Sequence, residues 1–143
     1  MTDRPDATEA ARLRELAEDQ PPFGQLLGVR IVSAERDRVV AEFVVTPQLG
    51  NRNGVLHGGA VMGIADGMGG TATFLNLPDG ASTSTIESKT NFFAAIAMGE
   101  TARAETTLLH RGRTTQVWQT RITRADGRLA ALVTQTQIVM PAK

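Results

Sequence analysis

The chain has 143 residues, of which 41% are hydrophobic and 21% are charged, as expected for one globular domain with its own core. Its 15 basic residues balance its 15 acidic residues, so it lacks the basic footprint of a general nucleic-acid binder. The absence of cysteine excludes disulfides, a thiol nucleophile and cysteine-ligated metals. Two histidines are too few for a histidine-rich metal site. We therefore expect no bound metal.

The N-terminal segment is polar and acidic, and it has no apolar core of the kind found in signal peptides. No run of the chain approaches the ~18 apolar residues of a membrane-spanning helix. These features favour a cytoplasmic protein that does not bind membranes.

Apolar residues at helical spacing predict a short helix over 7–19, which Pro21 and Pro22 end. A turn that carries Phe23, Leu26 and Leu27 is expected next. Alternating apolar residues then predict two strands, over 29–36 and 38–46, and turn-forming residues predict a loop over 47–53. We expect an N-terminal arm over 1–20 and a single domain over 21–143.

The segment 58–75 is the only long candidate for a second helix. Its apolar residues cover most of the circumference, which is typical of a buried helix. The segment also contains Gly63, Gly67, Gly69 and Gly70, and each interior glycine costs ~1 kcal/mol relative to alanine. This cost indicates that a wrapping sheet or a second copy of the helix packs very close to it.

Strand patterns fill the rest of the chain, over 82–93, 99–110, 114–124 and 129–140. Asp126-Gly127 between the last two is typical of a tight hairpin. The order β-β-α-β-β-β-β predicts an α+β fold, in which one antiparallel sheet of about six strands surrounds a long helix.

The segment from Asn51 to Asp66 carries the candidate chemistry. Its His57-Gly58-Gly59 stretch opens the helix, where the backbone N–H groups of a helix start are free to bind a ligand. Asp66 is a carboxylate on an apolar helix, which is expensive to bury unless it is paired or used. Together they suggest half of an active site, with donors that polarise a carbonyl and an acid or base that acts on it.

Two other enzyme signatures are rejected. The stretch from Gly67 to Ala72 fits G-x-G-x-x-A, but it lies inside the helix instead of following a strand, as a dinucleotide site requires. No G-x-S-x-G is present, so the nucleophile elbow of a serine hydrolase is absent.

The strand order, with His-Gly-Gly opening the helix, resembles the hotdog fold, and the local motifs resemble the PaaI-like thioesterases, which hydrolyse acyl-CoA. The matching motifs lie in four places and cover roughly residues 20–140. They are Phe23 to Val32, Asn51 to Asp66, Thr85 to Phe93, and His110 to Thr114 with the Asp126-Gly127 hairpin.

The resemblance implies a role for each matching position. Asp66 falls at the catalytic carboxylate, and Gly58 falls where a backbone N–H meets the thioester carbonyl. Asn51 and His57 fall where side chains position the thioester and the attacking water. Thr85, or else its neighbours Ser84 and Thr83, falls near that water.

The resemblance also implies which residues contact the substrate. Coenzyme A is part of that substrate, so we expect no separate cofactor. Cations would bind its phosphates, and apolar side chains would line the acyl pocket. Candidate residues are Gly59, Phe23, Leu26, Leu27, Phe92 and Phe93 for the thioester and acyl group, and Lys89, Arg52, Arg111, Gly112 and Arg113 for the phosphates. Phe92 and Phe93 should point to opposite faces of a strand, so at most one should line a given pocket.

Structural alternatives stand beside these roles. Asn51 could form an Asx-turn, and His57 could cap the helix. Thr85 could be an ordinary strand residue, and the two arginines beside Gly112 could lie at a solvated hairpin tip.

Spacing predicts that the site is shared between subunits. Gly58 and Asp66 are eight positions apart, ~12 Å at 1.5 Å per helical residue, whereas reacting groups must lie within ~3 Å of one thioester. Two antiparallel copies of the helix could supply both groups, so we expect a homodimer with two sites. The resemblance adds the expectation that dimers pair into tetramers.

The sequence leaves two other functions open. One is a hotdog hydratase or dehydratase, although the His–acid motif of those enzymes is not found. The other is a non-catalytic acyl-CoA-binding module. The aryl or fatty acyl group is also left open, as is the choice between Asp66 as base and Asp66 as nucleophile.

Overall fold

The computed structural model describes residues 7–143; the predicted arm over 1–20 begins outside them. The elements are α1 (Ala7–Glu18), α2 (Pro22–Leu26), β1 (Arg30–Ala34), β2 (Arg38–Val44), η1 (Pro47–Leu49), α3 (Gly58–Phe74), β3 (Ser82–Phe92), β4 (Thr101–Arg111), β5 (Thr115–Thr123) and β6 (Leu129–Met140). The predicted strands and the helices predicted over 7–19 and 58–75 are confirmed within a few residues. No helix in the described part is both long enough and apolar enough to span a bilayer.

The expected turn after Pro21 is instead the short helix α2. Pro22 occupies its first turn, where the fixed φ of proline suits a helix start and the missing N–H costs nothing. The two prolines therefore end one helix and begin another. The predicted loop over 47–53 contains a second short helix, the 3₁₀ turn η1.

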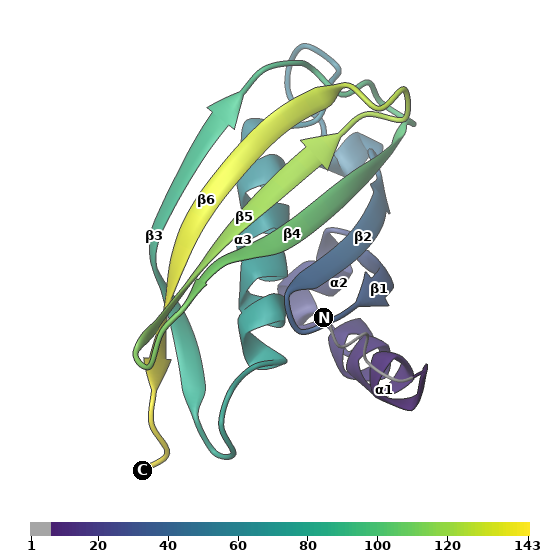
Figure 1. Cartoon of the computed structure of the whole chain (residues 1–143). Helices are drawn as coiled ribbons and strands as arrows, with labels where there is room; N and C mark the ends of the chain where they lie inside the picture. The colour runs from purple at the N-terminus through teal and green to yellow at the C-terminus, as the bar shows by residue number, and fades with distance from the viewer. Residues whose placement is uncertain (1–6) are drawn as a thin grey trace.

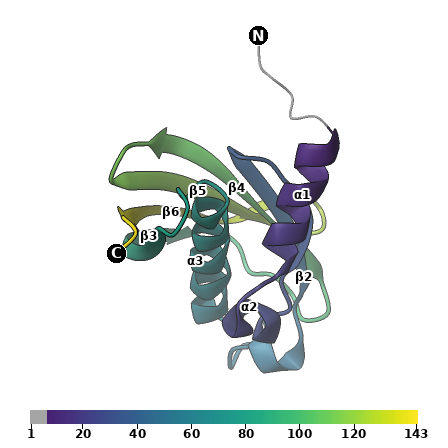
Figure 2. The same cartoon turned by 90° about the horizontal axis from the view of Figure 1, so that it is seen from below.

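All six strands form one antiparallel sheet, in the order β1-β2-β4-β5-β6-β3. The sheet curves around α3, which lies on its concave side, and α1 packs beside β1 (Figure 1). The view from below shows α3 on one side of the curved strands, with α2 close to one end of α3 (Figure 2). This is the hotdog architecture that the sequence predicts.

The core lies between α3 and the sheet. Ile64 and Met68 of α3 and Trp118 of β5 are among its fully buried side chains, and Leu13 and Ala17 of α1 belong to the same cluster. Within the single chain, the helix that the sequence predicts to be buried is covered on part of its surface. Met62 is 43% exposed and Phe74 is 53% exposed, so one stripe of α3 lacks cover in the single chain.

The helix glycines have different neighbours. A Cβ at Gly69 would collide with Gln135 of β6, so the sheet approaches the helix backbone there. A Cβ at Gly63 would lie 3.0 Å from the ring of Phe23 in α2. No atom of the described residues lies within 4 Å of a Cβ at Gly67 or Gly70. The close packing predicted from sequence is therefore explained within the chain at two of the four positions.

Candidate functional site

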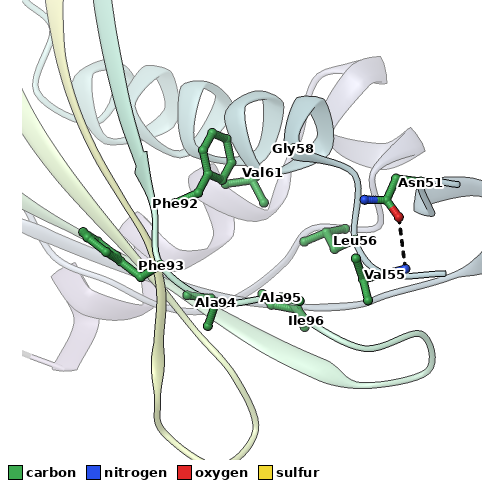
Figure 3. A pocket seen from close by; sticks show the side chains of 11 residues that line it. Asn51, Val55, Leu56, Gly58, Val61, Phe92, Phe93, Ala94, Ala95 and Ile96 are labelled. Carbon is green, nitrogen blue, oxygen red and sulfur yellow. Dashed lines mark hydrogen bonds between the residues drawn. The ribbon is translucent and has the colours of Figure 1, made fainter. Parts of the chain in front are cut away.

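The turn that leads into α3 is built around Asn51. Its Oδ1 accepts hydrogen bonds from the backbone N–H groups of Asn53 at 2.9 Å and Val55 at 3.3 Å, while Gly54 takes a positive φ of 75°, which glycine adopts without strain. Asn51 is therefore an Asx-turn residue. With Oδ1 occupied, the amide nitrogen remains free, and it points away from the turn (Figure 3).

His57 caps the start of α3. Its Nδ1 accepts a hydrogen bond of 2.8 Å from the N–H of Gly59, which satisfies one of the free donors of the first turn. Because Nδ1 is the acceptor, the neutral ring carries its hydrogen on Nε2. The ring is exposed, so Nε2–H remains available as a donor.

Gly58 offers the free donor at this helix start. The N–H groups of Gly59 and Ala60 are both bonded to His57, but the N–H of Gly58 has no partner among the described residues. This N–H lies at the positive end of the helix dipole. It is therefore suited to polarise a carbonyl or to stabilise an oxyanion.

Gly58 opens onto a mainly apolar pocket of about 380 Å³. Its walls come from the turn, the start of α3, the end of β3, the segment after it and the start of β6 (Figure 3). The lining residues besides Gly58 are Asn51, Val55, Leu56, Val61, Phe92, Phe93, Ala94, Ala95, Ile96 and Ala130. The prediction that at most one of Phe92 and Phe93 would line a pocket is wrong. Strand β3 ends at Phe92, so strict alternation no longer applies to the next residue.

Asp66 opens onto a different, larger pocket of about 700 Å³. Its walls come from the end of α1, the segment up to α2, one side of α3 and the first half of β3, namely Leu16, Ala17, Asp19, Gln20, Pro21, Pro22, Gln25, Gly67, Gly70, Thr71, Phe74, Thr83, Ser84, Thr85 and Gln137. The carboxylate is exposed instead of buried. Asp66 therefore faces open space in the single chain.

A hydrogen bond joins Asp66 to the sheet. The hydroxyl of Thr85 on β3 donates to Oδ1 of Asp66 at 2.6 Å. Thr85 in turn accepts from Nε2 of Gln137 on β6 at 2.6 Å. The structure thus brings Asp66 and Thr85 into contact, and it separates both from Gly58, because the two pockets share no lining residue.

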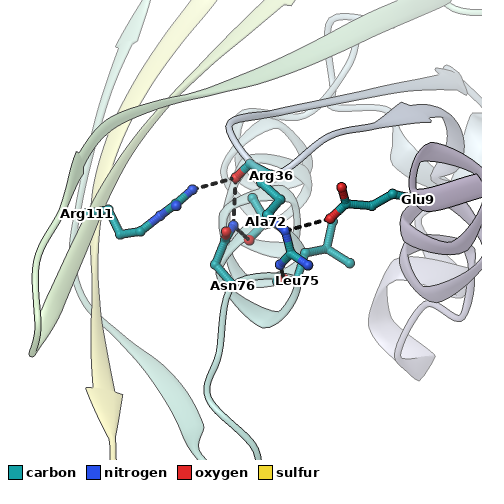
Figure 4. Close-up of polar contacts among 6 residues, drawn as sticks. All are labelled: Glu9, Arg36, Ala72, Leu75, Asn76 and Arg111. Carbon is teal, nitrogen blue, oxygen red and sulfur yellow. Dashed lines mark hydrogen bonds and ion pairs between the residues drawn. The ribbon is translucent and has the colours of Figure 1, made fainter. Parts of the chain in front are cut away.

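The remaining predicted residues lie outside the two pockets. Phe23 and Leu27 pack over α3 at Gly63, Leu26 is exposed, and Lys89 is exposed on β3. Arg111 is held by the backbone: its guanidinium donates to the carbonyl of Arg36 at 3.2 Å, beside the end of α3 (Figure 4). Gly112 forms the β4–β5 turn, with its N–H bonded to Thr115.

The two remaining candidate cations, Arg52 and Arg113, are also exposed. Arg113 lies at the β4–β5 turn, and Arg52 lines a shallow hollow together with Gly50, Asn51, Asn53 and His57. Arg52 therefore lies at the same end of α3 as Gly58.

Sequence reasoning missed Gln137, Leu16, Pro22 and Phe74 as residues of the Asp66 pocket. For Gln137 a signal existed, because it falls on the same row of its strand as the apolar Ala131 and Val133. A polar side chain on such a row needs a buried partner. The residues of α1 and α2 give no such signal, since their place beside Asp66 depends on how α1 packs against the sheet.

The class that this fold and site define is a hotdog-fold hydrolase. Residues 53–131 match the family model of the thioesterase superfamily, and the chain belongs to this family. The family predicted from the sequence is thereby confirmed.

Named relatives and solved structures agree with this membership. A 1,4-dihydroxy-2-naphthoyl-CoA hydrolase of Listeria monocytogenes is 30% identical over 100 residues, which cover 69% of this chain and 80% of the relative. Thioesterase PA1618 of Pseudomonas aeruginosa is 26% identical with a TM-score of 0.81, over 97% of this chain and 96% of that one.

Two further solved structures share the fold. A thioesterase protein of Streptococcus pneumoniae, solved with coenzyme A, is 25% identical with a TM-score of 0.74, over 80% of this chain and 88% of that one. The PaaI protein of E. coli is 21% identical with a TM-score of 0.81, over 92% of this chain and 98% of that one; this likeness concerns the fold.

Proposed function

We propose that this chain hydrolyses acyl-CoA thioesters as a homodimer, with Asp66 of one subunit acting on a carbonyl that the Gly58 N–H of the other subunit polarises. One observation carries the proposal. The free N–H and the carboxylate lie on one helix but open onto separate pockets. Each subunit would therefore contribute the N–H donor to one active site and the carboxylate to another.

The length of α3 supports this arrangement. Gly58 and Asp66 are separated by about two turns of helix, or ~12 Å along the axis. A bound thioester needs an oxyanion donor and an attacking group within ~3 Å of the same carbonyl. A second α3 that runs antiparallel to the first would place each Asp66 near a Gly58 of its partner.

The chain has an uncovered surface on which such a partner fits. Met62, Asp66, Gly70 and Phe74 follow one another on one side of α3 at intervals of four residues, and Gly67 lies next to Asp66. All five are exposed or partly exposed. An apolar stripe of this kind marks an interaction surface.

The neighbouring strand β3 is an edge of the sheet, and its Ile86 is 58% exposed. Unpaired edge strands are templates for pairing with another chain. Pairing of β3 with its copy would continue the sheet across a two-fold axis. We further expect such dimers to assemble in pairs.

Coenzyme A as the leaving group fits the residues around Gly58. A relative that hydrolyses a CoA ester and a similar structure that holds coenzyme A support this choice. Arg52 lies beside Asn51 and His57 and could bind a phosphate. Arg113 lies at the β4–β5 hairpin near the opposite end of α3 (Figure 1), so an antiparallel partner would bring its own Arg113 toward the Gly58 end.

The pocket at Asp66 would hold the acyl group. Leu16, Pro22 and Phe74 give it apolar walls, and its volume of about 700 Å³ is within the range of small-molecule sites. Both aryl and fatty acyl groups fit these walls. Asp66 would either activate water as a general base or attack the thioester as a nucleophile.

Subunit complementation tests the shared site. Asp66→Ala and Asn51→Ala subunits are each expected to form dimers with little activity. A mixed dimer would combine both defects in one site and leave the other site intact. Random re-association of equal amounts should therefore restore about a quarter of the wild-type thiol release from an acyl-CoA panel.

Three outcomes would contradict the proposal. Mixing that restores no activity, while mass spectrometry shows that mixed dimers have formed, would exclude a shared site. Saturable acyl-CoA binding by the wild type without thiol release would indicate a binding module, and product formation without free thiol would indicate a hydratase or dehydratase.

A further inference from the structure

Gln137 is a buried polar side chain with both ends of its amide in use. It lies on β6 and is 1% exposed. Its Nε2 donates to Thr85 Oγ1 at 2.6 Å, and its Oε1 faces the Thr83 hydroxyl at 3.0 Å. A buried amide requires such partners, so its orientation matters to both threonines.

The amide orientation determines where the single hydrogen of the Thr85 hydroxyl points. A hydroxyl offers one hydrogen and two lone pairs. Thr85 uses a lone pair to accept from Gln137, which leaves its hydrogen for Oδ1 of Asp66, 2.6 Å away. The three residues thus form a chain of donors, from Gln137 through Thr85 to Asp66.

A reversed amide would break this chain. Oε1 of Gln137 would then face Thr85 and take its hydrogen, and an ionised Asp66 would face an oxygen lone pair. Thr83 would tolerate the reversal, since its hydroxyl also has the Ile138 carbonyl at 2.8 Å as an acceptor. The charged carboxylate and the observed amide orientation therefore favour each other, because a hydrogen bond to a charged acceptor is the stronger kind.

We propose that Gln137 is a positioning residue that acts through Thr85 to hold the Asp66 carboxylate ready for reaction. The inference rests on the catalytic role proposed for Asp66. Within residues 7–143, Oδ1 is the carboxylate oxygen that takes part in a hydrogen bond. Oδ2 is left for the water or the thioester carbon, and the Thr85 bond limits rotation of the group.

A double-mutant cycle tests this chain. Gln137→Met removes the amide at nearly constant length, and Thr85→Val removes the hydroxyl at nearly constant shape. Each change is expected to lower kcat by roughly tenfold to a hundredfold, the scale for a misplaced reacting group, with little change in KM. Because Gln137 acts through Thr85, the double variant should lose no more than Thr85→Val alone.

Gln116→Met is the matched control. Gln116 lies on β5 in register with Gln137 and is also buried, at 2% exposed, but it makes no bond to Thr85 or Asp66. It should keep the wild-type kcat. Because Oε1 of Gln116 has no hydrogen-bond partner among the described residues, methionine at this position should not destabilise the fold. Thermal unfolding of every variant identifies the conditions under which each is folded.

Gln137→Glu serves if Gln137→Met does not fold. It keeps the shape of glutamine, but an ionised carboxylate would accept the Thr85 hydrogen, so kcat should again fall. Multiplicative losses in the cycle, or a folded Gln137 variant with wild-type kcat, would overturn the inference while Asp66→Ala remained inactive. An active Asp66→Ala variant would instead show that the proposed catalytic role had failed.

Discussion

Nε2 of Gln135 lies in the space that the Cβ of any larger residue at position 69 would need. The amide reaches under α3 and faces the backbone carbonyls of Ala65 and Asp66, each at 3.3 Å. Gly69 is therefore the point at which the sheet holds the helix, one turn beyond the candidate catalytic carboxylate.

Gly69→Ala is expected to destabilise the protein by about 1–3 kcal/mol, the usual cost of forcing atoms into a packed interior. The Gln135 side chain would have to move and lose its contacts with both carbonyls. Urea unfolding monitored by Trp118 fluorescence measures the loss. An unchanged midpoint would show that the contact is unimportant.

Gly67→Ala should weaken the dimer without destabilising the fold of the subunit. A methyl group there meets no atom within 4 Å among residues 7–143, and alanine should favour the helix by ~1 kcal/mol. The partner helix proposed above would be pushed away, so the dimer should dissociate at lower dilution and lose activity. Sedimentation velocity over a dilution series measures this; a tighter, fully active dimer would contradict the packing of a partner at this position.

Asp66→Asn should lower kcat by ~100-fold or more, the scale of a lost general base or nucleophile. Asparagine Oδ1 can still accept from Thr85, so folding and KM should change little. A single turnover of the wild type in ¹⁸O water tests the nucleophilic role: label in the peptide that contains Asp66 shows that water attacked an anhydride at the Asp66 carbon.

Arg36→Ala should cost about 1–2 kcal/mol, because it leaves a helix-end carbonyl without its donor. The guanidinium donates to the carbonyl of Leu75 at 2.9 Å and pairs with Glu9 of α1 at 2.9 Å (Figure 4). Arg14→Ala is the control, since it breaks an exposed pair with Glu18 and should cost under ~0.5 kcal/mol. Equal changes in melting temperature would show that Arg36 is only a surface residue.

Much of the fold could be predicted because its signals are local. Alternation marked the strands, and the glycine and aspartate turns marked their ends. The helix cap at His57 and the Asx-turn at Asn51 were also foreseen as alternatives, since they involve residues two to four positions apart. The roles assigned to these residues, to Thr85 and to the arginines stay predictions.

Nonlocal packing could not be predicted. The contact of Gln137 with Thr85 joins residues 52 positions apart, and strand register decides it. The place of Leu16 beside Asp66 depends on the docking of α1. Part of α3 is exposed in the single chain although its composition is apolar. An apolar pattern along a helix cannot distinguish burial within a chain from burial between chains.

The wall of the Asp66 pocket has two origins. One side is α3 and the sheet, which hold the carboxylate; the other is the segment from Leu16 to Gln25, which adds no strand to the sheet. Under the proposed function, size preference and chemical competence would therefore be carried by separate parts of the molecule. Changes in residues 16–25 would then admit longer or broader acyl groups while the hydrogen bonds at Asp66 stayed intact, which makes this segment the place to begin when retargeting the proposed activity.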